Sequence, residues 1–453
     1  AVRMLELAHK EHGRLPWAEA WAPAERLAAE GFKVSPRLHG LIEENLQLKE
    51  TPAARAYFYD AKGAPRAVGD VLKNPQYAEV LRRIGAEGAD AFYKGPIAEA
   101  IVAAVNGAPK PGGMTLEDLA NYKPVKREAV CSVYRALKLC SMPPPSSGGV
   151  TLLEILALLE PFKLSRMKPE SVDALHLFFE AGKLAYADRN QYLADKDKSG
   201  EAGGLTQQEV IAGLLDRRYL ADRAKRIDPA RAATTVKPGD PGKFVADPAV
   251  AAKWRALGTD ASGDGPSTSH FVIIDGAGRV VSMTTTVEFA FGSQQMAMGM
   301  VLNNQLTDFS FLPTVNGVPV ANAVAPGKRP RSSMTPVVIF DKKGNVWGAL
   351  GSPGGPAIMG YVAKTVIAML DWGMTMQQAI DLPNIVNPRG AATLERGRFD
   401  AATIEALKQR GHAVSERELT SGVHGVRVLK NGAYDGGADK RREGVVLTGA
   451  VAQ

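Results

Sequence analysis

The sequence predicts an α+β protein built as a helix-sheet-sheet-helix sandwich. Up to about residue 230 the apolar residues recur mainly with helical spacing, whereas beyond residue 266 apolar and polar residues alternate as in strands. Three pairs of alternating runs are joined by short turns rich in Gly or Asn, which is typical of β-hairpins. Two helical stretches, 358–371 and 375–382, lie between the second and third pairs. Strand pairs with helices available for their outer faces favour this layered architecture.

The N-terminal half consists of helical stretches separated by turn-rich pieces. Thr115 is followed by Glu117 and Asp118, a hydroxyl cap with early acids that predicts a helix start. Residues 129–142 are different, because they alternate around Arg135-Ala136 and predict an inserted hairpin with a two-residue turn. The helical periods cover residues 16–29, 78–84, 95–106, 171–193 and 207–225.

A connector separates this half from the strand-rich half. Residues 228–266 are rich in Pro, Gly, Ala, Asp and Lys, so we expect a long exposed segment that is functional or mobile. The strands predicted after it pair 271–275 with 280–286, 337–341 with 346–350, and 423–429 with a partner beyond the Asn431-Gly432 turn.

Composition limits the class of protein. The chain has 453 residues, 45% of them hydrophobic and 23% charged, which excludes general disorder. At about 100–200 residues per domain, the length suggests two or three domains or one large layered body. A net charge of +7 without a run of five basic residues favours anionic small molecules over nucleic acid as partners. No apolar stretch approaches the roughly 18 residues of a membrane span.

Two cysteines, Cys131 and Cys140, are too few for a disulfide-rich scaffold or a cysteine zinc cluster. In the predicted hairpin they face each other as a non-hydrogen-bonded pair, where Cβ atoms approach the separation that a disulfide needs. A disulfide and two reduced, half-buried thiols both fit this arrangement. The chain begins at Ala1 without the apolar core of a signal peptide, so we expect that a targeting segment has been removed or that upstream sequence is absent.

Common catalytic motifs are missing. The sequence has no Gly-x-Ser-x-Gly turn, no His-Glu-x-x-His, no phosphate-binding loop and no dinucleotide fingerprint after a strand. Among seven histidines only His9 and His12 have even loose ligand spacing. We therefore expect no metal and no cofactor, and a hydrolase built on this chain needs a nucleophile with a base other than histidine.

Residues 267–270 offer such a nucleophile where the connector enters a strand. A cut between Ser267 and Thr268 would leave Thr268 with both a free α-amine and a hydroxyl. An α-amine, with a pKa of about 7.7–8.0, can accept the proton of its own hydroxyl at neutral pH. The alternative is a Ser/Thr-rich strand start without a catalytic role.

Two further features fit a hydrolase. Thr286 ends a threonine run that would place a hydroxyl beside the nucleophile, although threonines also occur simply as β-branched strand residues. Gly354 and Gly355 lie in a glycine turn between a strand and a helix, where backbone N–H groups suit an oxyanion. A glycine turn without catalytic duty is the alternative.

Polar clusters further along the chain suit a zwitterionic substrate. Residues 303–305 with Asp308 have the groups to bind an amine, and Arg331 with Ser332 and Ser333 has those to bind a carboxylate. Each cluster is also typical of ordinary loop and capping chemistry.

Eight segments match one known pattern in order and cover essentially the whole chain. They are residues 92–95, 141–149, 186–189, 268–271, 292–293, 302–305 with 308–310, 328–334 and 351–355. In these segments the chain resembles the γ-glutamyltranspeptidase (γ-glutamyltransferase) family of N-terminal nucleophile hydrolases.

The resemblance implies the four-layer αββα sandwich of those hydrolases and an inactive precursor that cuts itself between Ser267 and Thr268. Residues 1–267 would be the large subunit and 268–453 the small catalytic one, together one domain and a heterodimer. The resemblance also implies a periplasmic or secreted enzyme without a cofactor. Its substrates would be γ-glutamyl amides such as glutathione, and its acyl acceptors water, amino acids or peptides.

The family's roles transfer to matching positions of this sequence. Thr268 would attack the γ-glutamyl carbonyl with its own amine as base. The remaining roles fall to Thr286, which orients the nucleophile, Gly354 and Gly355 as oxyanion hole, Gln305 and Asp308 for the substrate α-amine, and Ser332 and Ser333 for its α-carboxylate.

Three departures stand out. The family has a substantial stretch of chain before the point equivalent to Ala1, including an arginine that pairs with the substrate carboxylate, so we expect the N-terminal part of the large subunit to be missing here. No residue of this sequence matches that arginine, and Arg331 is an untested substitute. Glu288 stands where transpeptidases more often have asparagine, which implies either stronger α-amine binding or kinship with the related cephalosporin (glutaryl) acylases. Residues 310–326 are short for a lid over the glutamate pocket and have no tyrosine, which favours hydrolysis over transfer.

Two rival functions follow. The nearest is a cephalosporin (glutaryl) acylase on the same scaffold. The second is a non-catalytic binding relative, against which the joint presence of Thr268, Thr286, Gly354 and Gly355 argues, because a binding protein needs none of them.

Overall fold

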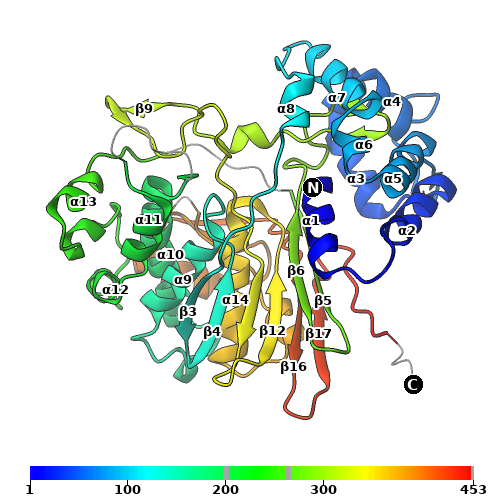
Figure 1. The fold of residues 1–453 in the computed structure, drawn as a ribbon. Helices are drawn as coiled ribbons and strands as arrows, with labels where there is room; N and C mark the ends of the chain where they lie inside the picture. Colours follow the sequence, from blue (N-terminus) through cyan, green and yellow to red (C-terminus); the bar gives the residue numbers. More distant parts are fainter. Residues whose placement is uncertain (197–203, 261–266, 389, 450–453) are drawn as a thin grey trace. The chain divides into compact units, whose positions relative to one another are not determined.

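A computed structural model describes residues 1–196, 204–260, 267–388 and 390–449. The chain divides into two compact units (Figure 1). The first comprises Ala1–Lys126 and Val287–Asn304, the second Arg127–Thr286 and Gln305–Gln453. We describe each by itself. Among the residues that the structure describes, no helix is both long and apolar enough to cross a lipid bilayer.

The first unit is mainly helical. Helices α2 and α5 pack on each other, and the predicted start at Thr115 is confirmed as a capping box with Asp118. An apolar cluster that includes Val80, Ile84 and Ile97 forms its core. Its elements are α1 (Val2–His12), α2 (Trp17–Glu30), β1 (Phe32–Lys33), α3 (Pro36–Glu44), η1 (Leu46–Glu50), α4 (Pro52–Phe58), β2 (Val71–Leu72), α5 (Pro75–Glu87), α6 (Asp90–Tyr93), α7 (Pro96–Asn106), α8 (Leu116–Ala120), β7 (Met296–Ala297) and β8 (Met300–Val301).

A six-stranded antiparallel sheet is the centre of the second unit. Strand β4 pairs with β11, so that Ser141 lies opposite Val337, and this pairing joins segments from both sides of Ser267. Two of the predicted hairpins, 337–350 and the one that turns at Asn431-Gly432, are confirmed in this sheet. The strands in spatial order are β17 (Tyr434–Ala438), β16 (His424–Val428), β12 (Val346–Gly351), β11 (Val337–Phe340), β4 (Leu137–Ser141) and β3 (Val130–Tyr134).

Apolar helices cover one face of this sheet. Helix α9 packs against β3 and β4, and α14 against β12. Leu152, Leu156, Val362 and Val366 on these two helices are almost fully buried, so both helices are apolar around most of their circumference. The helices of this unit are α9 (Gly148–Leu159), η2 (Leu164–Arg166), α10 (Val172–Tyr192), α11 (Gln207–Leu214), α12 (Arg217–Ala224), η3 (Pro241–Phe244), α13 (Pro248–Lys253), η4 (Gln305–Asp308), η5 (Gly355–Ala357), α14 (Ile358–Leu370), α15 (Met376–Asp381) and α16 (Ala401–Gln409).

The predicted hairpin of β5 (Ser269–Ile274) and β6 (Val280–Thr285) packs against the sheet at β12 and β16. The unit thus has a helical layer, a large sheet and a two-stranded hairpin. The α+β class is confirmed, and the four-layer sandwich stays a prediction. The remaining strands are β9 (Thr314–Val315), β10 (Val318–Pro319), β13 (Ile385–Val386), β14 (Ala392–Glu395) and β15 (Val414–Arg417).

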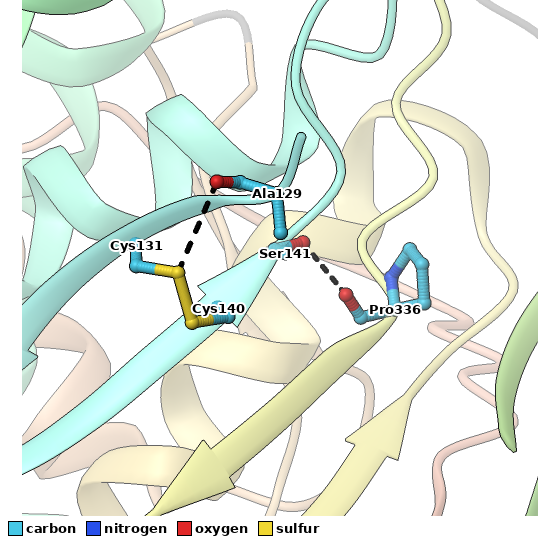
Figure 2. The surroundings of a disulfide bond; sticks show 5 residues. All are labelled: Ala129, Cys131, Cys140, Ser141 and Pro336. Carbon is cyan, nitrogen blue, oxygen red and sulfur yellow. Dashed lines mark hydrogen bonds between the residues drawn. A yellow bond between two sulfur atoms is a disulfide. The ribbon is translucent and has the colours of Figure 1, made fainter. Parts of the chain in front are cut away.

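The inserted hairpin β3–β4 turns at Arg135 and Ala136, whose φ angles of 47° and 70° are those of a tight two-residue turn. Its register places Cys131 opposite Cys140, with Cα atoms 4.1 Å apart. The structure joins the two sulfur atoms in a disulfide (Figure 2).

Two expectations from the sequence are wrong. The helical period 207–225 is two helices, because Asp216 caps a new helix at its N-terminus. The connector contains η3 and α13 and is not uniformly exposed between residues 228 and 260, because Pro241 and Gly242 of η3 are buried. Trp254 is buried against Tyr192, whose hydroxyl donates to the carbonyl oxygen of Gly239 over 2.5 Å. Residues 261–266 of the connector lie outside the described residues.

Candidate active site

Thr268 and Thr286 stand at corresponding ends of one hairpin. Thr268 directly precedes β5, Thr286 directly follows β6, and the register pairs Ser269 with Thr285. Extending this antiparallel register by one residue places Thr268 opposite Thr286, and their hydroxyl oxygens lie 3.4 Å apart. The hairpin therefore brings together two hydroxyls that are 18 positions apart in the chain.

The carbonyl group of Ser267 lies against both hydroxyls. The Thr286 hydroxyl donates a hydrogen bond to the Ser267 carbonyl oxygen over 2.9 Å, and the Thr268 hydroxyl donates to the same oxygen. Thr268 is buried, with 8% of its surface exposed. A hydroxyl, the adjacent carbonyl and a hydrogen-bond donor to that carbonyl oxygen are thus in place, and such a donor stabilises the negative charge that attack on the carbonyl creates.

Two basic side chains support this end of the hairpin. Arg442 Nη1 donates to the carbonyl oxygen of Thr268 over 2.9 Å. His270 is buried against Gly351, where an added Cβ would lie 2.3 Å from the imidazole ring. Burial, with a smaller contribution from the charge of His424, lowers the pKa of His270 to about 3, so its ring is neutral at neutral pH. Nothing in the sequence indicated Arg442, because it is 174 residues away from Thr268.

The glycine turn follows strand β12 and precedes helix, as predicted: Gly354 caps η5, and Gly355 is the first residue of η5, which leads into α14. Their φ angles are 135° and 56°, conformations that glycine adopts without a Cβ penalty. At Gly354 a Cβ would also lie 2.7 Å from the ring of Tyr361. The oxyanion role of these two residues stays a prediction.

Residues 145–149 brace the segment that contains Ser332 and Ser333. The Ser332 amide donates to the Pro145 carbonyl oxygen over 3.0 Å. Ser147 donates to the Ser332 carbonyl oxygen through both its amide, at 2.7 Å, and its hydroxyl, at 2.8 Å. Gly148 permits this approach, because a Cβ there would lie 2.1 Å from Thr335 Oγ1. The motif was visible in the sequence, but nothing in it indicated which segment it contacts.

Gln305 and Asp308, the two residues predicted to bind an α-amine, touch each other on η4. The Gln305 side-chain amide donates to Asp308 Oδ2. Asp308 is buried, and the side-chain amide of Asn322 donates to its backbone carbonyl oxygen over 2.7 Å. Both residues are thereby fixed in one short turn, while their role in binding stays a prediction.

Arg331 pairs with a carboxylate of the protein itself. Its Nη2 lies 2.9 Å from Asp260 Oδ2, and both side chains are 1% exposed. Its guanidinium is therefore engaged, which removes support for Arg331 as a substitute carboxylate ligand. Another arginine, Arg189, contacts the serine pair, because its Nη2 donates to Ser333 Oγ over 2.6 Å.

Glu288 belongs to the first unit. It is buried, with 4% exposure, and its φ of 77° is uncommon for a residue with a side chain. The chain around it is held by Asn304, whose amide donates to the Val287 carbonyl oxygen and whose side-chain oxygen accepts from the Phe289 amide. A substrate role for Glu288 stays a prediction.

One cluster of metal-ligand type occurs among the described residues, formed by His176, Glu180 and His412. Glu180 is paired with Lys183 at 2.8 Å and also accepts from the Ala233 amide. His176 contacts His412 through Nδ1, at 2.8 Å, and the Asp228 carbonyl oxygen through Nε2. Because a buried ammonium already neutralises the only acid, we assign no metal to this cluster.

A cavity of about 830 Å³ borders helix α10, the segment 233–238 and Pro356. None of the site residues predicted above lines it, although Arg189 does. We therefore assign it no substrate.

Over residues 1–449 the chain matches the gamma-glutamyltranspeptidase family. The chain belongs to this family. The glutathione hydrolase proenzyme of Escherichia coli is 32% identical to this member of the gamma-glutamyltranspeptidase family, over 97% of this chain and 73% of the relative. The acylase ACY 1 proenzyme of Pseudomonas sp. strain SE83 is also 32% identical, with the same coverage of both chains.

A solved structure supports the fold. The cephalosporin acylase from Bacillus halodurans matches 99% of this chain and 77% of its own chain, with a TM-score of 0.81 and 24% identity. At that identity the likeness concerns the fold alone. The family is thus established, and relatives of two substrate classes are equally similar in sequence.

Proposed function

We propose that this protein is a self-processing N-terminal threonine hydrolase of γ-glutamyl amides such as glutathione. The observation that carries the proposal is the contact of the Thr268 and Thr286 hydroxyls with the Ser267 carbonyl oxygen. Membership of the gamma-glutamyltranspeptidase family supports it.

The first reaction is the cut of the chain itself. The Thr268 hydroxyl oxygen attacks the Ser267 carbonyl carbon, the bond to the Thr268 nitrogen breaks, and that nitrogen takes the hydroxyl proton. Thr286 donates to the carbonyl oxygen while negative charge develops on it. Water then hydrolyses the ester, which leaves a carboxylate on Ser267 and a free α-amine on Thr268. The two products, 1–267 and 268–453, remain together as a heterodimer.

The second reaction uses the amine that the first one creates. With a pKa of about 7.7–8.0, the α-amine takes the proton of the Thr268 hydroxyl as its oxygen attacks the γ-carbonyl of the substrate. The amides of Gly354 and Gly355 stabilise the oxyanion, and the substrate amine leaves with the proton. Water releases the acyl group from Thr268, or an amino acid or peptide amine accepts it.

Substrate selection follows from the zwitterionic end of a γ-glutamyl group. Ser332 and Ser333 hold the α-carboxylate, whereas Gln305, Asp308 and Glu288 hold the α-amine. The second candidate function is a cephalosporin (glutaryl) acylase, which the equal identity to an acylase proenzyme favours. A glutaryl group keeps the carboxylate and lacks the amine, so the acidic residues decide between the two functions.

The disulfide of Cys131 and Cys140 supports a periplasmic or secreted location, because such bonds persist in oxidising compartments.

The test is denaturing electrophoresis of the purified chain, with N-terminal sequencing of the products. We expect two chains, the smaller beginning at Thr268, and a single uncut chain for Thr268→Ala. The cut protein should hydrolyse γ-glutamyl anilide faster than glutaryl anilide. A chain that stays whole or is cut elsewhere refutes the mechanism, and a preference for the glutaryl substrate establishes the acylase instead.

A further inference from the structure

Arg189 lies on α10 and is 3% exposed. Its guanidinium donates to three side-chain oxygens, from Nε to Ser147 Oγ at 2.9 Å, from Nη1 to Asn190 Oδ1 at 2.9 Å and from Nη2 to Ser333 Oγ at 2.6 Å. Ser147 is the residue that donates to the Ser332 carbonyl oxygen. The guanidinium therefore connects the segment 145–149, through Ser147, with the serine pair, through Ser333.

The direction of these hydrogen bonds constrains the serines. A guanidinium has five N–H donors and no acceptor, so both serine oxygens accept from Arg189. The hydroxyl hydrogen of Ser333 consequently points away from the arginine. A serine hydroxyl that accepts from a cation is polarised, which makes it a better donor to an anion on its other side.

We propose that Arg189 is the positioning residue of the carboxylate end of the acyl pocket. It orients the Ser333 hydroxyl toward the substrate carboxylate and supplies positive charge directly behind it. The inference rests on the proposed function for the place of the carboxylate, and it adds a residue and a specificity rule to that function. Since glutamyl and glutaryl groups both carry this carboxylate, Arg189 selects for the carboxylate and leaves the choice between the two groups to the acidic residues.

The geometry favours Arg189 over the neighbouring arginines of the second unit. Arg331 is paired with Asp260, and Arg223 is paired with Asp188 at 2.8 Å. Arg189 has its hydrogen bond on Ser333 itself. Arg189 also lies in the segment 186–189, one of the eight that match the family pattern. The catalytic residues alone give this segment no role, whereas positioning of Ser333 does.

The test compares three anilides with wild type, Arg189→Lys and Arg189→Gln. The γ-glutamyl substrate has both charged groups, the glutaryl substrate only the carboxylate, and the 4-aminobutyryl substrate only the amine. For the first two we expect KM to rise about 10- to 100-fold, more for Gln than for Lys, because a hydrogen bond to a charged group is lost. For the third we expect KM within about twofold of wild type, and kcat should change little for all three.

Arg223→Lys is the matched control, because it shortens another buried arginine of the same unit, whose guanidinium is bound to Asp188 and to the carbonyl oxygens of Leu184 and Lys237. This control should change KM for all three substrates by the same factor. A Ser333→Ala background should reduce the effect of Arg189→Lys on KM, since the two residues act through one hydrogen bond. Equal losses for all three substrates, or none for the carboxylate-bearing ones, overturn the proposal.

A binding measurement separates this proposal from the hydrolase function. Calorimetry with glutamate, glutarate and 4-aminobutanamide, which has the amine and no carboxylate, needs no turnover. The variant used is Arg189→Lys, because it keeps the positive charge and is available if Arg189→Gln fails to fold; it should weaken binding of only the two dicarboxylates. If wild type hydrolyses no substrate, the hydrolase function fails, and this binding pattern alone still upholds Arg189. If wild type is active and Arg189→Lys binds all three ligands as wild type does, the Arg189 proposal alone fails.

Discussion

The hydroxyl of Thr286, the residue directly after strand β6, donates a hydrogen bond to the carbonyl oxygen of Ser267, the residue just before the predicted cut. Removing such a donor from a developing oxyanion costs about 10²- to 10³-fold in rate. We therefore expect Thr286→Ala to slow self-cleavage by that factor and Thr286→Ser to cut at near the wild-type rate. A time course of the uncut band on denaturing gels measures both, and wild-type cleavage by Thr286→Ala would contradict the assignment.

The acidic residue Glu288 provides a prediction about substrate choice. Its left-handed backbone, with φ of 77°, is a conformation in which Asn is enriched, so Glu288→Asn should leave the chain path unchanged. If Glu288 binds the substrate amine, its loss should raise KM for γ-glutamyl anilide at least about tenfold, the lower end for a charged hydrogen bond. KM for glutaryl anilide should stay the same, and a parallel loss on both substrates would show that Glu288 acts on folding instead.

The buried pair of Arg331 and Asp260 predicts strong coupling in stability. Truncating one partner of a buried ion pair costs roughly 3–5 kcal/mol, because the other charge remains buried. We expect Asp260→Leu and Arg331→Met each to lower the free energy of unfolding by about that amount, and the double variant that carries both substitutions to recover much of it. Urea denaturation of wild type, the two single variants and the double variant gives the coupling energy. Additive losses would mean that the pair contributes little.

The burial of His270 predicts that the free energy of unfolding decreases as the pH falls. Its pKa is lowered to about 3 in the folded chain by burial and by His424, whereas the unfolded ring has a pKa of about 6.5. Between pH 6.5 and 3 the unfolded state therefore binds a proton that the folded state does not. The contribution of the neutral, buried His270 to the free energy of unfolding is complete above about pH 6.5 and is lost as the pH falls. It changes by about 1.4 kcal/mol per pH unit. Denaturation midpoints between pH 7 and 5 should fall less steeply in His270→Asn, and an unchanged slope would exclude a neutral, buried His270.

The disulfide predicts a stability change that is independent of catalysis. It joins residues nine positions apart, and closing so short a loop contributes roughly 2–3 kcal/mol in the chain-entropy account. The variant with both Cys131 and Cys140 replaced by Ser should unfold at lower urea concentration and still cut itself. Reduction of wild type should reproduce the shift, while leaving the Ser variant unaffected.

Local patterns predicted much of the second unit. Alternation and glycine turns gave β5–β6, β11–β12 and β16–β17, because hairpins depend on neighbouring residues. The order of strands in the sheet was beyond such patterns, since β4 meets β11 only in the folded chain, as the Ser141 hydroxyl meets the Pro336 carbonyl oxygen 195 residues away. Burial of Trp254 was missed for the same reason, because the connector's composition resembles that of an exposed segment.

The candidate site divides in the same way. Motif order indicated Thr268, Thr286, the glycine turn and the serine pair, and the structure brings the first two within 3.4 Å. The supporting side chains Arg189 and Arg442 were not predicted as partners, because their hydrogen bonds to Ser333 and Thr268 span 144 and 174 residues. Sequence spacing carries no information about contacts of that range.

The pairing of β4 with β11 bears on how the two pieces of the proposed cut would assemble. Four residue pairs of this ladder link a strand from before Ser267 to one from after it, so the proposed cut would leave the interior of the sheet intact. Separated pieces would each present an unpaired strand edge, which invites aggregation. Under the proposed function, the uncut chain would therefore bring the two pieces together by folding as one, and pieces made separately should precipitate where the uncut chain stays in solution.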